Sequence, residues 1–278
     1  MLRIVTLNAA NYDDIHCWDE RKPAIVDALV GCKADIIALQ EVRFDAGEES
    51  TETSYLNMGE QLTLELQKRS GYEASSVVYQ WAQYYDPVTH NVTSNLTNLW
   101  EGLAVISRKP FIETGTTFLS MPPNSGDLNH RITQYAAFYP DSGGVLYLFN
   151  THFAVYEWCS QCAVLNATDT LKYMSRFSSS PRLLVGDLNI TPDIKEVYDL
   201  LTGGGLVDVW PAKHSSEEKG YTYPSWSPNE RIDYIWADKS LLGKIDSIEL
   251  IPMQEMKDCP YPQTYASDHL GLVATLSI

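Results

Sequence analysis

The chain has 278 residues, of which 44% are hydrophobic, so it is long enough to bury a large core. Its 36 acidic and 20 basic residues give a net charge of −16, which opposes non-specific attraction to polyanions such as nucleic acids. The basic residues are scattered, and no apolar run approaches the roughly 20 residues that cross a bilayer, which excludes a transmembrane segment.

Runs rich in branched and aromatic residues predict strands along the whole chain, at 2–7, 35–40, 72–79, 102–106, 132–138, 145–150, 182–185, 232–236, 245–251 and 271–277. Helical spacing predicts helices at 19–31, 56–69, 160–177 and 193–202. Because strands and helices are interleaved without a linker or repeat, we expect one domain, 1–278, of the α/β class, in which helices cover packed sheets.

Four connecting segments are unusually aromatic: 79–100, 156–162, 221–228 and 259–265. Long ordered loops are often functional, and aromatic faces stack on bases, sugars or apolar groups. The other interpretation is that these rings only pack the loops onto the sheets.

The cysteines do not indicate a disulfide framework, because five is an odd number in a large chain. Cys159 and Cys162 form a C-x-x-C pair that fits a small disulfide, a redox pair or two unrelated thiols, and we expect thiols without special chemistry. Sequons at Asn91, Asn95 and Asn166 permit secretion without showing it. The compartment stays open between a cytoplasmic location for a soluble protein and secretion with a leader removed.

The stretch LLVGDLNITPD places Asp187 and Asn189 directly after an apolar strand-like run. Both are ordinary turn formers. Alternate residues leaving a strand also point the same way, so the acid and the amide can reach one ligand together.

Polar side chains follow the predicted strands in the same way all along the chain. The residues at or near these strand ends are Asn8, Gln40, Glu41, Glu101, Arg131, Asn150, His152, Asp187, Asn189, Asp233, Ser267, Asp268 and His269. These are the residue types that hold a hard cation and move protons.

The series LQEV, NTHF, GDLN, RIDYIW and SDH resembles the endonuclease/exonuclease/phosphatase superfamily, over nearly the whole chain. The resemblance implies a four-layered α/β sandwich, with two packed, mostly antiparallel β-sheets flanked by helices and the active site at one end. It also implies a Mg²⁺-dependent phosphoester hydrolase, with Mn²⁺ as a substitute ion.

Residue by residue, the resemblance assigns Glu41 as the principal metal ligand, with Asn8 and Asp268 close to the ion. It assigns Asp187 and Asn189 to the scissile phosphate and the attacking water. His269 matches the family's catalytic histidine and Asp233 its carboxylate partner. His152 and Glu101 resemble the second histidine–carboxylate pair of the deoxyribonuclease branch, and Arg131 resembles a phosphate-contacting arginine.

Phosphoester chemistry agrees with these roles. A phosphodiester is anionic and repels hydroxide, so its hydrolysis needs charge neutralisation and an oriented water. Mg²⁺ prefers carboxylate oxygen and retained water, and a histidine held by a carboxylate can move a proton near neutral pH.

The substrate stays open in the sequence. LNAANYDD lacks the continuation typical of abasic-site endonucleases, and SPNERIDYIW differs from the motif of inositol 5-phosphatases. We expect a monomer that hydrolyses a phosphodiester, with nucleic acid or a phospholipid headgroup as candidate partners. A phosphomonoesterase and a catalytically silent binding module are the alternatives.

Overall fold

The computed structural model describes residues 1–11, 15–45, 55–69, 71–72, 75–123, 125, 127–260 and 264–278. Its strands are β1 (Leu2–Asn8), β2 (Ile36–Asp45), β3 (Ser76–Tyr85), β4 (Val92–Thr93), β5 (Leu99–Ser107), β6 (Glu113–Phe118), β7 (Ile132–Phe138), β8 (Leu146–His152), β9 (Arg182–Asp187), β10 (Leu206–Asp208), β11 (Asp233–Asp238), β12 (Ile245–Ile251) and β13 (Gly271–Leu276). Its helices are α1 (Trp18–Gly31), α2 (Met58–Gln67), α3 (Ser160–Met174), α4 (Lys195–Gly203) and α5 (Val209–Lys213), with two 3₁₀ turns, η1 (Ser175–Phe177) and η2 (Lys239–Lys244).

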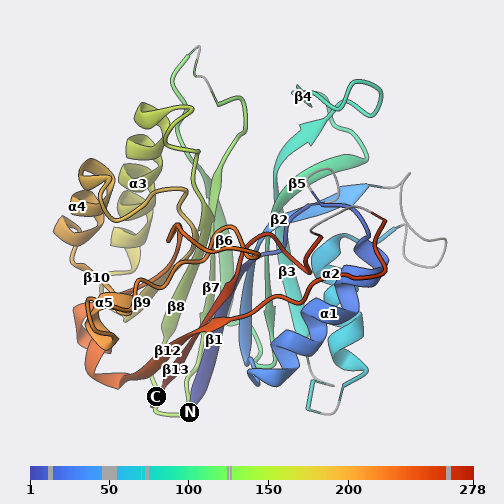
Figure 1. The fold of residues 1–278 in the computed structure, drawn as a ribbon. Coiled ribbons are helices and arrows are strands. Elements are labelled where there is room, and N and C mark those ends of the chain that lie inside the picture. The colour runs from blue at the N-terminus through green and yellow to red at the C-terminus, as the bar shows by residue number, and fades with distance from the viewer. Residues whose placement is uncertain are drawn as a thin grey trace.

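The strands form two sheets (Figure 1). The order is β12-β13-β1-β2-β5-β3-β4 in the seven-stranded sheet and β10-β11-β9-β8-β7-β6 in the six-stranded sheet. Pairing is antiparallel except between β1 and β2 and between β8 and β9. The expected fold, two mostly antiparallel sheets with helices on the outside, is confirmed.

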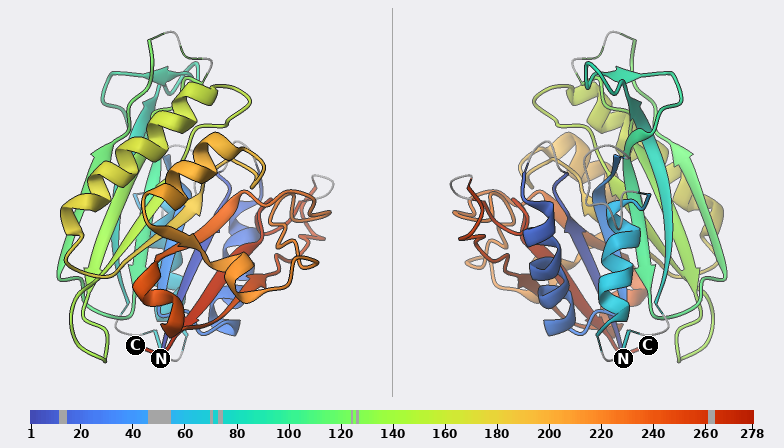
Figure 2. Two further views of the ribbon diagram at one scale, coloured as in Figure 1. Left: turned by 90° about the vertical axis from the view of Figure 1, so that its left-hand side faces the viewer. Right: turned by 90° about the vertical axis from the view of Figure 1, so that its right-hand side faces the viewer.

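The alternation of apolar residues along the strands explains the layers. One set of buried side chains, including Ile4, Ile36 and Val185, fills the space between the sheets. Helices α1 and α2 cover the outer face of the seven-stranded sheet, and α3 and α4 cover that of the six-stranded sheet (Figures 1 and 2). The burial of apolar surface, which contributes about 25 cal/mol of stabilisation per Å², is the main favourable contribution to the packing of such layers.

A buried polar pair crosses the space between the sheets. The Gln40 side chain donates to Asn150 Oδ1 at 2.7 Å, and Asn150 donates to the carbonyls of Leu39 and Ala104 at 3.0 and 3.1 Å. Both side chains are fully buried. These two strand-end residues therefore join the sheets.

Two predictions from the sequence were wrong. The segment 79–100 is not mainly a loop, because β3 runs through to Tyr85 and β4 and the start of β5 follow. The cysteines are also not all thiols: disulfides join Cys17 to Cys259 and Cys159 to Cys162, and Cys32 is the free one. Pairing partners 242 residues apart cannot be recognised from spacing.

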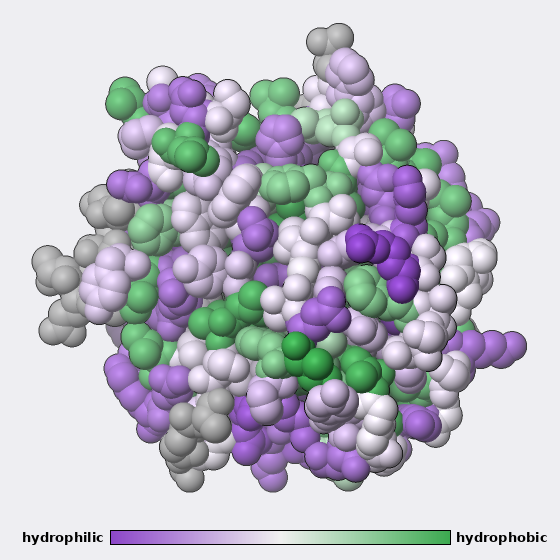
Figure 3. All heavy atoms as spheres, turned by 180° about the vertical axis from the view of Figure 1, so that it is seen from behind, coloured by the Kyte–Doolittle hydropathy of each residue, from purple (hydrophilic) through white to green (hydrophobic). Residues whose placement is uncertain are grey.

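In the described part of the chain, no helix is both long and apolar enough to span a membrane. Seen from behind, hydrophobic residues are scattered among hydrophilic ones (Figure 3).

Candidate active site

Strands β1 and β2 deliver the first site residues. Their parallel register pairs Asn8 with Gln40, so Glu41 follows immediately at the same end of the sheet. The register of β2 against β5 shifts between Leu39 and Val42, and Glu41 has a φ of +55°. A left-handed glutamate in a β-bulge is strained, and bulges of this kind re-aim a side chain beside functional sites.

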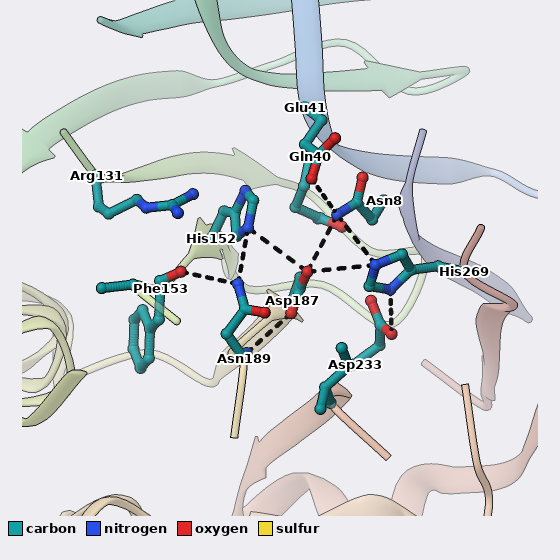
Figure 4. Close-up of polar contacts among 12 residues, drawn as sticks. Asn8, Gln40, Glu41, Arg131, His152, Phe153, Asp187, Asn189, Asp233 and His269 are labelled. Atoms are coloured by element: carbon teal, nitrogen blue, oxygen red, sulfur yellow. Dashed lines mark hydrogen bonds and ion pairs between the residues drawn. The ribbon is translucent and has the colours of Figure 1, made fainter. Parts of the chain in front are cut away.

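The second sheet contributes a row of three residues on adjacent strands. His152 on β8 pairs with Asp187 on β9, and Asp187 pairs with Asp233 on β11. The row faces Asn8 and Glu41 across the end of the sandwich (Figure 4).

Gly186 explains how Asp187 reaches this position. Gly186 has a φ of +142°, and a Cβ atom there would lie 1.9 Å from the carbonyl oxygen of Thr151. Only glycine allows β9 to approach β8 this closely. The turn that follows is fixed by the Asp187 carboxylate, whose Oδ1 accepts a hydrogen bond from the backbone N–H of Asn189 at 2.9 Å. Asn189 itself has a φ of +49°.

The Asn8 side chain joins the two sheets at the centre of the site. Its amide nitrogen donates to Glu41 Oε1 at 2.9 Å and to Asp187 Oδ2 at 3.1 Å, and lies 3.5 Å from His269 Nε2. In this arrangement, Asn8 presents a donor to both carboxylates and orients them.

His269 and Asp233 form a buried pair. His269 Nδ1 lies 2.8 Å from Asp233 Oδ2, and Nε2 lies 3.7 Å from Asp187 Oδ2. Burial alone would lower the pKa of His269, but the charges of Asp233 and Asp187 outweigh it and raise the pKa well above its usual value. The imidazole is therefore held protonated, with Nε2–H toward Asp187.

His152 has the opposite electrostatic state. Burial, the charge of Arg131 and the charge of His269 together lower its pKa. The Asn189 amide nitrogen donates to the carbonyl of Phe153 at 3.1 Å and lies 3.0 Å from His152 Nε2 (Figure 4). The lowered pKa favours the neutral imidazole, whose Nε2 also lies 3.5 Å from Asp187 Oδ2.

Asp187 lies between these groups. Burial is the largest cause that raises its pKa to about 6; Asp233 raises it further, whereas His269 opposes the increase. A buried carboxylate with this pKa can exchange a proton near neutral pH.

Glu101 lies in the same cavity, beside residues that the sequence did not single out. Asn11 donates from its side chain to Glu101 Oε2 at 2.9 Å and to Glu41 Oε2 at 3.1 Å. Arg43 Nη1 lies 3.6 Å from Glu101 Oε2, and its guanidinium stacks 4.2 Å from the Tyr85 ring centroid. These contacts link Glu101 to Glu41 through Asn11, whereas the hydrogen bonds described for His152 lead to Asn189.

The signal for the two missed residues was present but weak. Arg43 lies two residues after Glu41 on the same strand, and Asn11 lies three residues after Asn8 in the connection that follows β1.

Arg131 directs Nη2 to Asp127 Oδ2 at 3.4 Å, and its Nε has no hydrogen-bond partner among the described residues.

The residues fit a hard divalent cation. Ligand atoms of Asp187, Asp233 and His269 lie within 4.8 Å of one another, and His269 would have to lose its proton to act as a ligand. Asp268 Oδ1 and Asp233 Oδ1 are buried and have no hydrogen-bond partner among the described residues. Buried carboxylate oxygens are costly unless paired, so oxygens of this kind suit a bound cation.

The site opens into a cavity of about 950 Å³. Every aromatic segment noted in the sequence contributes to its walls, through Tyr85, Trp158, Tyr223, Trp226 and Thr264. Trp158 and Trp226 are 59% and 41% exposed. The ring centroids of Tyr223 and His269 lie 4.9 Å apart.

Carboxylates outnumber cations in the cavity. The described lining contains six acidic residues, Glu41, Glu101, Glu157, Asp187, Glu230 and Asp268, against Arg43, Arg131 and the protonated His269. The cavity is therefore acidic.

A sandwich with carboxylates, amides and histidines gathered at one end is the arrangement that the sequence resemblance implied. The model of the Endonuclease/Exonuclease/phosphatase family matches residues 5–269, and the chain belongs to this family, whose members are generally metal-dependent phosphoesterases.

Solved structures share the fold at low sequence identity. A family protein from Leptotrichia buccalis has a TM-score of 0.72 and 18% identity, with 100% of both chains covered. The human Nocturnin catalytic domain with bound sulfate has a TM-score of 0.66 and 18% identity, covering 98% of this chain and 93% of that one. A mannosyl-6-phosphatase from Bacteroides thetaiotaomicron has a TM-score of 0.65 and 17% identity over 100% of both chains. No curated protein matches the chain.

Proposed function

We propose that the chain is a Mg²⁺-dependent phosphodiesterase that hydrolyses its substrate by in-line attack of an activated water. The observation that carries the proposal is the convergence of Glu41, Asp187 and His269 around the Asn8 amide. These residues come from both sheets and from distant parts of the chain, and independent turns have no reason to meet in this way.

Glu41 and Asp268 are the proposed metal ligands, and Mn²⁺ is expected to substitute for Mg²⁺. When bound, the ion neutralises charge on the phosphate oxygens and acts as a Lewis acid. Asn8 orients the Glu41 carboxylate through its hydrogen bond of 2.9 Å.

Asp187 is the proposed group that orients the water and takes its proton. Asn189 contributes an amide beside it without adding negative charge to a site that receives an anion. His269, held by Asp233, stabilises negative charge on the phosphate or donates a proton. Arg131 and the neutral His152 are proposed to contact the phosphate, with Glu101 acting through Asn11.

The acidic cavity supports a small or lipid phosphodiester over a long nucleic acid. Binding to a duplex depends on many contacts between basic residues and phosphates. Cavities of this volume suit small ligands, and Trp158 and Trp226 offer exposed faces for an organic group. A few stacked nucleotides also fit this description.

A phosphomonoesterase is the second candidate, because a mannosyl-6-phosphatase shares the fold and two arginines line the cavity. A silent binding module is the third. The complete set of carboxylates and histidines opposes it, since a degenerate site is expected to have lost members.

We also propose that residues 1–278 form one catalytic domain that acts as a monomer. The two disulfides favour an oxidising compartment, and so secretion over a cytoplasmic location.

The test is hydrolysis of bis-p-nitrophenyl phosphate and of p-nitrophenyl phosphate, each with Mg²⁺ and with chelator. Faster Mg²⁺-dependent turnover of the diester supports the proposal, and faster turnover of the monoester supports the second candidate. A panel of DNA, RNA, sphingomyelin and phosphoinositides then identifies the substrate class. Absence of turnover on all of them contradicts the enzyme proposal, and turnover in chelator contradicts its Mg²⁺ dependence.

A further inference from the structure

Two distant segments of the chain meet at the candidate metal site. One runs from the end of β1 and carries Asn8 and Asn11; the other precedes β13 and carries Asp268 and His269. Ser267 joins them next to the site, because its hydroxyl donates to the carbonyl of Asn8 at 2.6 Å and accepts from the amide of His269 at 3.1 Å.

Arg21 on α1 joins the same two segments through its side chain. Its guanidinium donates to the carbonyls of Ala9, Ala10 and Ile15 at 2.5, 2.6 and 2.6 Å in the first segment. It also donates to the carbonyl of Ala266 at 3.0 Å in the second. Arg21 is fully buried.

A third link lies farther along both segments. The disulfide between Cys17 and Cys259 connects the residue before α1 to the loop that leads toward Ala266, with 6.0 Å between the Cα atoms. Cys17 has a φ of +64° and Ala10 a φ of +52°. These left-handed residues lie at either end of the segment whose carbonyls Arg21 holds, and such conformations persist only where surrounding contacts enforce them.

A fully buried arginine is a costly way to fill a core. Apolar residues of similar volume often stabilise a fold equally well or better, and buried charges are sometimes retained to specify one geometry. Here the guanidinium holds the backbone on both sides of the site, one residue from Asn8 and two from Asp268.

We propose that Arg21 is a positioning residue that, together with the Cys17–Cys259 disulfide, sets the distance between the Asn8–Asn11 segment and the Asp268–His269 segment and so preorganises the metal site. The inference rests on the proposed function, because it assumes a divalent cation between these segments. Arg21 does not line the cavity.

The consequence is that replacing Arg21 should weaken metal binding more than other substitutions that destabilise the fold to a similar extent. When the links are removed, Asp268 and Asn8, whose amide orients Glu41, no longer share a fixed separation, and the ion must order them on binding. Loss of groups that orient metal ligands typically weakens metal affinity about 10- to 100-fold.

The experiment measures Mn²⁺ binding by electron paramagnetic resonance, without substrate, in wild type, Arg21→Lys, Arg21→Gln and Leu29→Ala. Leu29 is the matched control: it is fully buried on the same helix and packs into the outer core. We expect Kd for Mn²⁺ to rise at least about 10-fold in the Arg21 variants and to stay unchanged in Leu29→Ala, although all of them lower Tm. Lysine should restore part of the affinity, because it keeps a donor.

Equal Mn²⁺ affinity in wild type and in the Arg21 variants overturns the inference and leaves the proposed function intact. If wild type binds no Mn²⁺, both fail. If the Arg21 variants do not fold, Cys17→Ser/Cys259→Ser tests the same arrangement at the disulfide: an unchanged Mn²⁺ Kd overturns the inference, and an increased Kd supports it.

Discussion

Glu41 and Asp187 share a single hydrogen-bond donor, the side-chain amide of Asn8, although they come from different sheets. Two carboxylates in reach of one amide repel each other in a buried site. The amide reduces this repulsion, and a divalent cation would remove it. The following predictions test this arrangement.

Glu41→Gln should weaken the binding of Mg²⁺, because it removes the charge of the principal proposed ligand. We expect a fall in kcat/KM of about 100-fold or more at limiting Mg²⁺, since metal ions contribute several kcal/mol to such reactions. The measurement is a Mg²⁺ titration of diester hydrolysis. Glu157→Gln is the control, because Glu157 lines the same cavity at an exposed position. Equal Mg²⁺ curves for the two variants would contradict the assignment.

His269→Ala should lower kcat by about 10²- to 10⁴-fold, the usual contribution of a positioned proton donor. Circular dichroism and Tm should show that the protein still folds. Asp233→Asn is expected to be less severe, because the imidazole remains but loses the charge that keeps it protonated. Normal turnover in His269→Ala would remove the proposed role.

The pH dependence of kcat/KM follows from Asp187, whose pKa is raised to about 6. Activity that needs the ionised carboxylate should rise with pH through this value and level off above it. Metal binding would lower the midpoint, so the profile should move toward acid as Mg²⁺ increases. A profile that falls between pH 5 and 7 would exclude Asp187 as the base.

The same pKa makes a prediction about stability without metal. The folded-state pKa of Asp187 lies above the usual value of 3.8, so the folded state binds the proton more tightly than the unfolded state. Its contribution to the free energy of unfolding therefore decreases from pH 3.8 to about 6 and stays low above that. In chelator, Asp187→Asn should raise Tm at pH 7 but not at pH 3.5, while abolishing activity. A lower Tm at pH 7 would show that the charge is fully compensated by His269.

Trp158→Ala should raise KM for a diester with a large organic group and leave kcat nearly unchanged. The reason is that Trp158 lies on the cavity wall, 59% exposed, away from the hydrogen bonds around Asp187. Comparison with dimethyl phosphate, which has no group to stack, provides the control. An equal change for both substrates would argue against a contact with the organic group.

Much of this architecture was predictable from the sequence. Each of the ten expected strands and four expected helices overlaps an observed one, because each has the periodicity that its buried face requires, although the strand expected at 72–79 lies at Ser76–Tyr85. The strands β4, β6 and β10 were missed: each is short or, like β6 (Glu113–Phe118), largely polar and partly exposed at a sheet edge. Such strands are specified by their neighbours and not by their own pattern.

The polar strand ends indicated the candidate site, but only the structure shows which of them point at each other. Gln40 and Asn150 were in the same series as Asn8 and Asp187, yet their side chains bond to each other between the sheets. Asn11 and Arg43 were missed because one lies in a connection and the other reads as an ordinary charged strand residue. Their importance depends on contacts with Glu101, 90 residues from Asn11.

The row formed by His152, Asp187 and Asp233 has a consequence for how such a protein can change. Each member is fixed by backbone pairing between neighbouring strands, so inserting one residue into β9 would turn Asp187 to the other face of the sheet. The cavity walls, in contrast, come largely from the connections that follow the strands. The row is therefore encoded in the strands, whereas wall residues such as Trp158 and Trp226 lie in connections, and selection can remodel these walls without disturbing the row.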